Sequence, residues 1–227
     1  GAFKEQTNVH AFTFEQITFG GSNAEEARAV AIWSTSKVIV GYTNSFGEGG
    51  YDAFIAVKED TTLNMWTIGT SNNDFAYAVA VYDNFAYIVG TTQNPFNYYD
   101  IFIAKWDLSD STLVATKFIA SGINAPQVDI AYAVATDGNY VFVTGRFADS
   151  YAFLAILNAI NLNIINFATL NLGSGNEIPY TIDFKLSDGV YRIIIGGTTN
   201  TAPTFGGYDA FITRIDFNGT TLTHIWS

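Results

Sequence analysis

The sequence predicts an all-β protein, a β-propeller of four-stranded antiparallel blades with four blades expected, and three observations support this. Four short landmarks recur in a fixed order along the 227 residues. Successive copies lie about 50 residues apart, measured between Gly41, Gly90, Gly145 and Gly197, which leaves room for four strands and their turns. Short segments rich in Val, Ile, Phe, Tyr and Thr alternate with Asp-Gly, Asn-Gly and Gly-Gly turns, so helix is almost excluded.

The first two landmarks of each repeat predict the outer and inner edges of a blade. The first is an apolar segment ending in Gly or Ser, and we expect it to form the outermost strand. Its copies lie at 17–21, 66–70, 118–122 and 167–173. The second is rich in Ala and Val, and its copies begin at Glu25, Asp74, Asp129 and Glu177. Both faces of this segment are apolar, which indicates an innermost strand that neighbouring blades cover on both sides.

The other two landmarks predict the middle of the blade. A β-branched segment ending in Gly is expected to form the second strand, with copies at 38–43, 86–92, 141–145 and 193–199. A Tyr-Asp-Ala-Phe-Ile type segment is expected to form the third strand, with copies at 51–55, 99–103, 151–154 and 208–212. Each repeat therefore supplies one complete blade in the order inner, second, third and outer strand.

The termini contain one outer strand too many for four blades. Inner strands begin near Ala27, Ala76, Ala131 and Tyr180, whereas outer strands are predicted at 12–19, 63–69, 113–120, 163–172 and 220–226. We expect one domain over 1–227, with repeats at 21–69, 70–120, 121–172 and 173–227, and residues 1–20 as a closing or exchanged strand. Closure within one chain is the favoured interpretation, and pairing with an edge strand of another copy is the alternative.

Taken in this order, the landmarks resemble the SBBP β-propeller repeat over nearly the whole chain. The resemblance implies a propeller, in a family usually pictured with more than four blades and found largely in secreted or surface-attached bacterial and archaeal proteins. This sequence departs from the pattern in its low copy number, in its divergent fourth inner strand, and in the third repeat, where Tyr151 holds the place of Asp52.

Composition excludes several classes of protein. The net charge is −11 with only 10 Lys plus Arg, so the chain has no basic face for nucleic acid. Cysteine is absent, which excludes disulfides and thiolate metal sites. The apolar runs fall well short of the roughly 20 residues that cross a bilayer, so no membrane span is expected. The acidic, Lys-poor composition favours an extracellular or cell-surface location.

Long aromatic loops predict a ligand-binding face. The loops between second and third strands contain the candidate ligand-binding residues Phe46, Tyr51, Phe96, Tyr98, Tyr99, Phe205 and Tyr208. Their rings could stack on sugar rings, and the alternative is that they cover the tops of the blades. Loops on the opposite face, such as Asp137-Gly138-Asn139, are tight turns with little reach.

A carboxylate enters each inner strand and gives a candidate metal site at Glu25, Asp74, Asp129 and Glu177. Propeller symmetry would place these four around the axial channel, where Ca²⁺ could bind their oxygens. The favoured alternative is that each carboxylate accepts backbone hydrogen bonds in its own turn, with no cofactor. Asp52, Asp100 and Asp209 also recur once per blade and are expected to be structural hydrogen-bond acceptors.

No catalytic motif stands out, because nucleophile-elbow, phosphate-loop and zinc-protease signatures are absent. The leading prediction is therefore a non-catalytic propeller with a structural or self-assembling role. Its expected partners are other copies of itself, surface proteins or glycans. The alternatives are a carbohydrate- or protein-binding module that uses the aromatic loops, and a hydrolase or lyase that uses two carboxylates.

Overall fold

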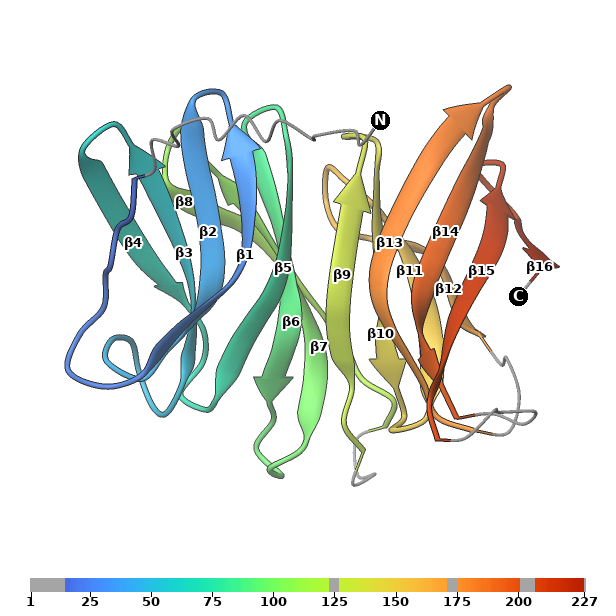
Figure 1. Ribbon diagram of the computed structural model, residues 1–227, viewed down its shortest axis with the longest axis horizontal. Coiled ribbons are helices and arrows are strands. Elements are labelled where there is room, and N and C mark those ends of the chain that lie inside the picture. The colour runs from blue at the N-terminus through green and yellow to red at the C-terminus, as the bar shows by residue number, and fades with distance from the viewer. Residues whose placement is uncertain (1–14, 123–126, 171–174, 201–206, 227) are drawn as a thin grey trace, which may run out of the picture.

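The computed structural model describes residues 15–122, 127–170, 175–200 and 207–226, and these form four antiparallel sheets of four strands each (Figure 1). The first blade contains β1 (Glu25–Trp33), β2 (Ser36–Thr43), β3 (Asp52–Glu59) and β4 (Thr62–Ile68). The second contains β5 (Asp74–Tyr82), β6 (Phe85–Gln93), β7 (Tyr99–Asp107) and β8 (Thr112–Ile119). The third contains β9 (Ile130–Thr136), β10 (Tyr140–Phe147), β11 (Tyr151–Asn158) and β12 (Ile164–Leu170). The fourth contains β13 (Glu177–Ser187), β14 (Val190–Thr199), β15 (Asp209–Phe217) and β16 (Leu222–Trp226).

The strand order within every blade follows the predicted order of the landmarks. Each sheet is a simple meander in which consecutive strands pair, so the Ala/Val segment and the Trp/Phe segment lie at opposite edges. The inner strands β1, β5, β9 and β13 lie side by side in chain order (Figure 1). None of the described residues forms a helix, and so none forms a helix that could cross a membrane. The extent of a single domain over 1–227 stays a prediction.

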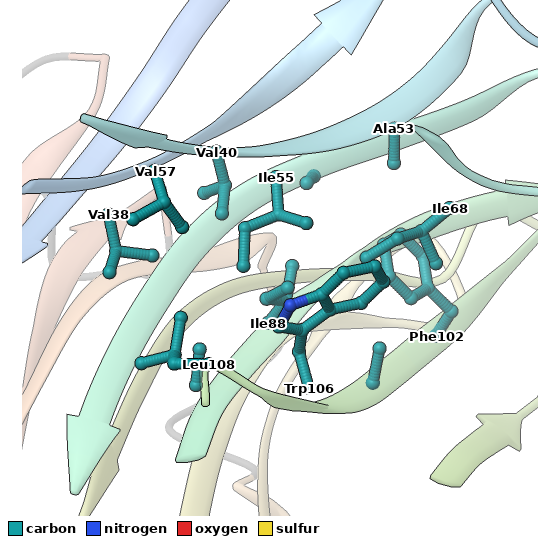
Figure 2. Close-up of a cluster of buried hydrophobic side chains, with 13 residues drawn as sticks. Val38, Val40, Ala53, Ile55, Val57, Ile68, Ile88, Phe102, Trp106 and Leu108 are labelled. Atoms are coloured by element: carbon teal, nitrogen blue, oxygen red, sulfur yellow. The ribbon is translucent and has the colours of Figure 1, made fainter. Parts of the chain in front are cut away.

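Hydrophobic cores fill the spaces between consecutive blades. Figure 2 shows the first, in which Val40 and Ile55 of blade 1 face Ile88 and Trp106 of blade 2. Two equivalent cores join blade 2 to blade 3 and blade 3 to blade 4. Within the described residues no extensive strand contact joins blade 4 back to blade 1. The four blades therefore form an open array rather than a closed ring.

The terminal strands differ from the sequence prediction. The segment 220–226 supplies β16, which pairs with β15 as the outer strand of blade 4. Residues 15–24 form no strand, and residues 12–14 lie outside the described residues. The described part of the chain thus has four outer strands and not five. Residues 15–19 pair with no strand among the described residues, and Phe19 packs edge-on against Phe54, with 5.8 Å between ring centroids.

Every inner strand contains a β-bulge at the same place in the repeat. In blade 3, Ala131 pairs with Gly145 and Ala133 pairs with Thr144, which leaves Tyr132 unpaired between them. The equivalent unpaired residues are Arg28, Tyr77 and Tyr180. Because a bulge inserts one extra residue, it turns that side chain away from the alternation of its strand.

Candidate functional site

The four bulge residues form a continuous row across the inner strands, which we call the inner row: Arg28, Tyr77, Tyr132 and Tyr180. The Arg28 guanidinium lies over the Tyr77 ring at 5.2 Å from its centroid. The centroids of Tyr77 and Tyr132 are 5.8 Å apart, and those of Tyr132 and Tyr180 are 5.6 Å apart. Each blade thus contributes one side chain at nearly equal steps.

The Arg28 end of the inner row holds an exposed carboxylate. Arg28 Nη1 donates to Glu26 Oε1 at 2.6 Å, and the Tyr42 hydroxyl donates to Glu26 Oε2. The hydrogen bond from Tyr42 and the pairing with Arg28 hold the pKa of Glu26 below its ordinary value. The side chains of Arg28 and Glu26 are 40% and 48% exposed, so this ionised group remains open to solvent.

Aromatic rings extend the inner row toward the loops. Phe75 lies 4.9 Å from Tyr42, 5.4 Å from Tyr51 and 6.2 Å from Tyr99, measured between centroids. It is also stacked on Tyr77 at 6.4 Å. Burial raises the pKa of Tyr77 to about 12, so its hydroxyl stays protonated and can donate hydrogen bonds at physiological pH.

The structure brings some of the predicted ligand-binding residues together and leaves others apart. Tyr51 and Tyr99 both contact Phe75 and so join the inner row. Phe46, Phe96 and Tyr208 are exposed and Tyr98 is half-buried, and no ring contact within the described residues links these four to that group. Phe205 lies outside the described residues.

Three of the four strand-entry carboxylates accept hydrogen bonds from residues near them. The Asp74 carboxylate accepts from Thr70 N at 2.7 Å, and the Asp129 carboxylate accepts from Ser121 N at 2.6 Å and Ala148 N at 2.7 Å. Glu25 accepts from Thr43 Oγ1 at 3.0 Å, and Glu177 is buried. The part of the chain that the structure describes contains no group of three or more His, Cys, Asp or Glu that could hold a metal. Asp74 and Asp129 thus accept hydrogen bonds from the loops beside them, and a calcium site at the four carboxylates stays a prediction.

A second pair of carboxylates is close together but buried. A Cβ added at Gly69 would lie 2.7 Å from Asp52 Oδ1 and 2.8 Å from Asp74 Oδ2, so both groups approach the same point. Burial, with smaller contributions from the charges of Asp74 and Glu48, raises the pKa of Asp52 to about 6. Each residue is only 2% exposed. A raised pKa beside a second carboxylate is a pattern of acid–base sites, but a polymeric substrate cannot reach these two side chains.

Comparison with known proteins gives a clear result for the fold. No protein-family model and no curated protein matches the sequence. Among solved structures, the β-propeller domain of the Trilobed protease from Pyrococcus furiosus is similar at 11% identity with a TM-score of 0.52. The chain has the β-propeller fold. The match covers 92% of this chain and 59% of the other, so this chain spans about three fifths of that propeller domain.

Weaker matches are glycoside hydrolases. The GH43 endo-arabinanase from Bacillus licheniformis is 12% identical with a TM-score of 0.44, over 88% of this chain and 75% of that one. A thermostable family-43 glycoside hydrolase is 11% identical with a TM-score of 0.45, over 88% and 70% of the two chains. The resemblance to the SBBP repeat stays a prediction.

The leading functional prediction, a non-catalytic propeller that assembles through a terminal strand, is wrong. The strand on which assembly depended is not free, since residues 15–24 form no strand and β16 already belongs to blade 4. The two alternatives, a binding module and a hydrolase or lyase, are therefore considered below.

Proposed function

We propose that the protein binds an extended, uncharged carbohydrate along the inner row and does so outside the cell. The single observation that carries this proposal is the row itself, with one aromatic or guanidinium plane per blade at steps of 5.6 and 5.8 Å between the tyrosines. Tyrosine offers an apolar face for a sugar ring and a hydroxyl for hydrogen bonding. Evenly spaced rings can contact successive sugar units of one polysaccharide.

Charge supports a neutral ligand and an external location. The net charge of −11 disfavours polysaccharides rich in carboxylate or sulfate, because like charges repel. Low Lys and Arg content and the resemblance to the SBBP repeat both favour a secreted or surface protein. Glu26 and Arg28 at one end of the inner row offer paired hydrogen-bond acceptors and donors to sugar hydroxyls.

Tyr132→Ala is expected to weaken binding of a neutral polysaccharide at least about tenfold, because it removes the central ring of the inner row. Affinity electrophoresis in gels containing arabinan, xylan or β-glucan identifies the ligand, and calorimetry with an oligosaccharide gives the affinity. Tyr82→Ala is the matched control, because Tyr82 lies on β5 outside the inner row and is 49% exposed. Equal affinities of the two variants, or no binding of any neutral polysaccharide, would contradict the proposal.

Hydrolysis of the bound carbohydrate is a second candidate function, favoured by the state of Glu26. A nucleophile or general base in glycoside hydrolysis must be ionised and aimed at the substrate. Glu26 meets the first condition through its lowered pKa, and Arg28 and Tyr42 fix its carboxylate at the end of the inner row. The geometry therefore points to cleavage near the blade 1 end of the binding surface.

Glu26→Gln is expected to reduce the release of reducing sugar at least about tenfold while leaving the affinity of the polysaccharide within about twofold. The substitution keeps the shape of the side chain and removes its charge. Glu59→Gln, at the exposed end of β3, is the control and should behave as the parent protein. If the parent protein binds a polysaccharide but releases no reducing sugar from it, the hydrolysis proposal is contradicted and the binding proposal is unaffected.

A further inference from the structure

The free face of blade 1 carries apolar side chains whose equivalents on β5 and β13 pack against the preceding blade. Val30 and Ile32 on β1 are 64% and 63% exposed. Their equivalents on β5, Val79 and Val81, pack against the core between blades 1 and 2. On β13 the position of Val30 is held by Ile182, which is buried in the core between blades 3 and 4. The sequence of β1 is thus that of a blade with a neighbour on both sides.

Part of such a neighbour is present. Phe19 packs on Phe54 of β3, with 5.8 Å between centroids. The same arrangement is found between blades 1 and 2 and between blades 2 and 3. Ile68, at the end of β4, shares a core with Phe102 of β7. Ile119, at the end of β8, shares a core with Phe153 of β11. Residues 15–19 therefore lie against blade 1 as the end of an outer strand lies against the blade that follows it.

The crossing loop after this segment also has the geometry of an interblade connection. A Cβ added at Gly20 would overlap Glu25 Oε2, and one added at the equivalent Gly69 would lie 2.8 Å from Asp74 Oδ2. Each carboxylate therefore folds back on the loop that precedes it. Residues 20–25 thus connect residues 15–19 to β1 as residues 69–74 connect β4 to β5.

We infer that blade 1 docks against a further blade of the same repeat, which precedes it in the polypeptide and has residues 15–19 as the end of its outer strand. The rest of that blade covers Val30 and Ile32. A second copy of this chain fits the face less well. In that second copy, the free face of blade 4 carries Asp183 at the position that Ala31 holds on β1 and Ala135 holds on β9. Docking of that face on blade 1 would bury the Asp183 charge against apolar side chains.

The test compares the 227-residue protein with a variant in which a copy of residues 74–107, the first three strands of blade 2, replaces residues 1–7. This junction gives Phe19 the same distance along the chain from the third strand that Ile119 has from Asp107. The extended variant is expected to melt at least about 4 °C higher. The double substitution Val30→Asp and Ile32→Asp should lower its melting temperature by at least about 4 °C, and that of the 227-residue protein by less than about 2 °C.

Val114→Asp is the control, because Val114 is 49% exposed on β8, away from this face, and should cost the same in both proteins. The inference is overturned if the extended variant is no more stable than the 227-residue protein, or if the double substitution costs the same in both. It is also overturned if analytical ultracentrifugation shows a dimer of the 227-residue protein that the double substitution dissociates. That result would assign the face to a second copy.

Discussion

Replacing Gly145 with alanine is expected to lower the free energy of unfolding by about 3 kcal/mol and to displace Tyr132 from the inner row. Gly145 pairs with Ala131 directly beside the bulge of blade 3. A Cβ at this position would overlap the carbonyl oxygen of Ile130, which is backbone and cannot rotate away. Relief therefore requires the bulge to open, and the bulge is what directs Tyr132 out of the strand alternation.

The measurements are denaturant unfolding, a melting temperature that should fall by about 6 to 12 °C, and the affinity for the polysaccharide. Gly196→Ala is the matched control in blade 4, because its added methyl group would meet a methyl group of Thr181 at 3.1 Å and no carbonyl oxygen within 3.4 Å. If the Gly145→Ala variant has the same free energy of unfolding as the Gly196→Ala variant, the bulge does not depend on Gly145. A destabilised variant with unchanged affinity would separate the bulge from the inner row.

The repeat landmarks were sufficient to predict the fold because each one encodes a local constraint. Small apolar residues such as Ala76 of β5 and Ala131 of β9 predict an inner strand between two neighbouring blades, and both residues are fully buried. The outer strand predicted at 12–19 depends instead on a partner strand. Residues 15–19 have the composition of an outer strand but pair with no third strand among the described residues, so their sequence alone could not decide their conformation.

The candidate site was only partly visible in the sequence. The strand-entry carboxylates were identified as a repeated feature, but their direction depends on loops such as that of Thr70, which Asp74 binds. The inner row was missed, although Tyr77, Tyr132 and Tyr180 stand at one position of the repeat, three residues after the carboxylate. The repeat position is visible in the sequence, but the distances between blades that bring Tyr77, Tyr132 and Tyr180 into one row are not.

Asp52→Asn is expected to stabilise the protein by about 2 kcal/mol at pH 8 and to have little effect near pH 4. Folding raises the pKa of Asp52 from 3.8 to about 6, chiefly by burial, so between these values the folded state binds more protons than the unfolded state. Stability contributed by this group is therefore present at low pH and is lost as the pH rises through about 6. Asparagine stays uncharged at every pH, and so removes this loss.

The measurement is the free energy of unfolding of both proteins from pH 4 to pH 8, by urea denaturation at each pH. The difference between them should grow from about pH 4 to about pH 6 and then level off, because Asp52 is ionised in both the folded and the unfolded state above that range. Asp110→Asn is the control, since Asp110 is exposed in the turn between β7 and β8 and should give a curve parallel to that of the parent protein. If the Asp52→Asn variant and the parent protein also gave parallel curves of unfolding free energy against pH, the Asp52 carboxylate would be equally stabilised in the folded and unfolded states. The close approach of Asp52 and Asp74 at Gly69 would then impose no electrostatic penalty at the junction of blades 1 and 2.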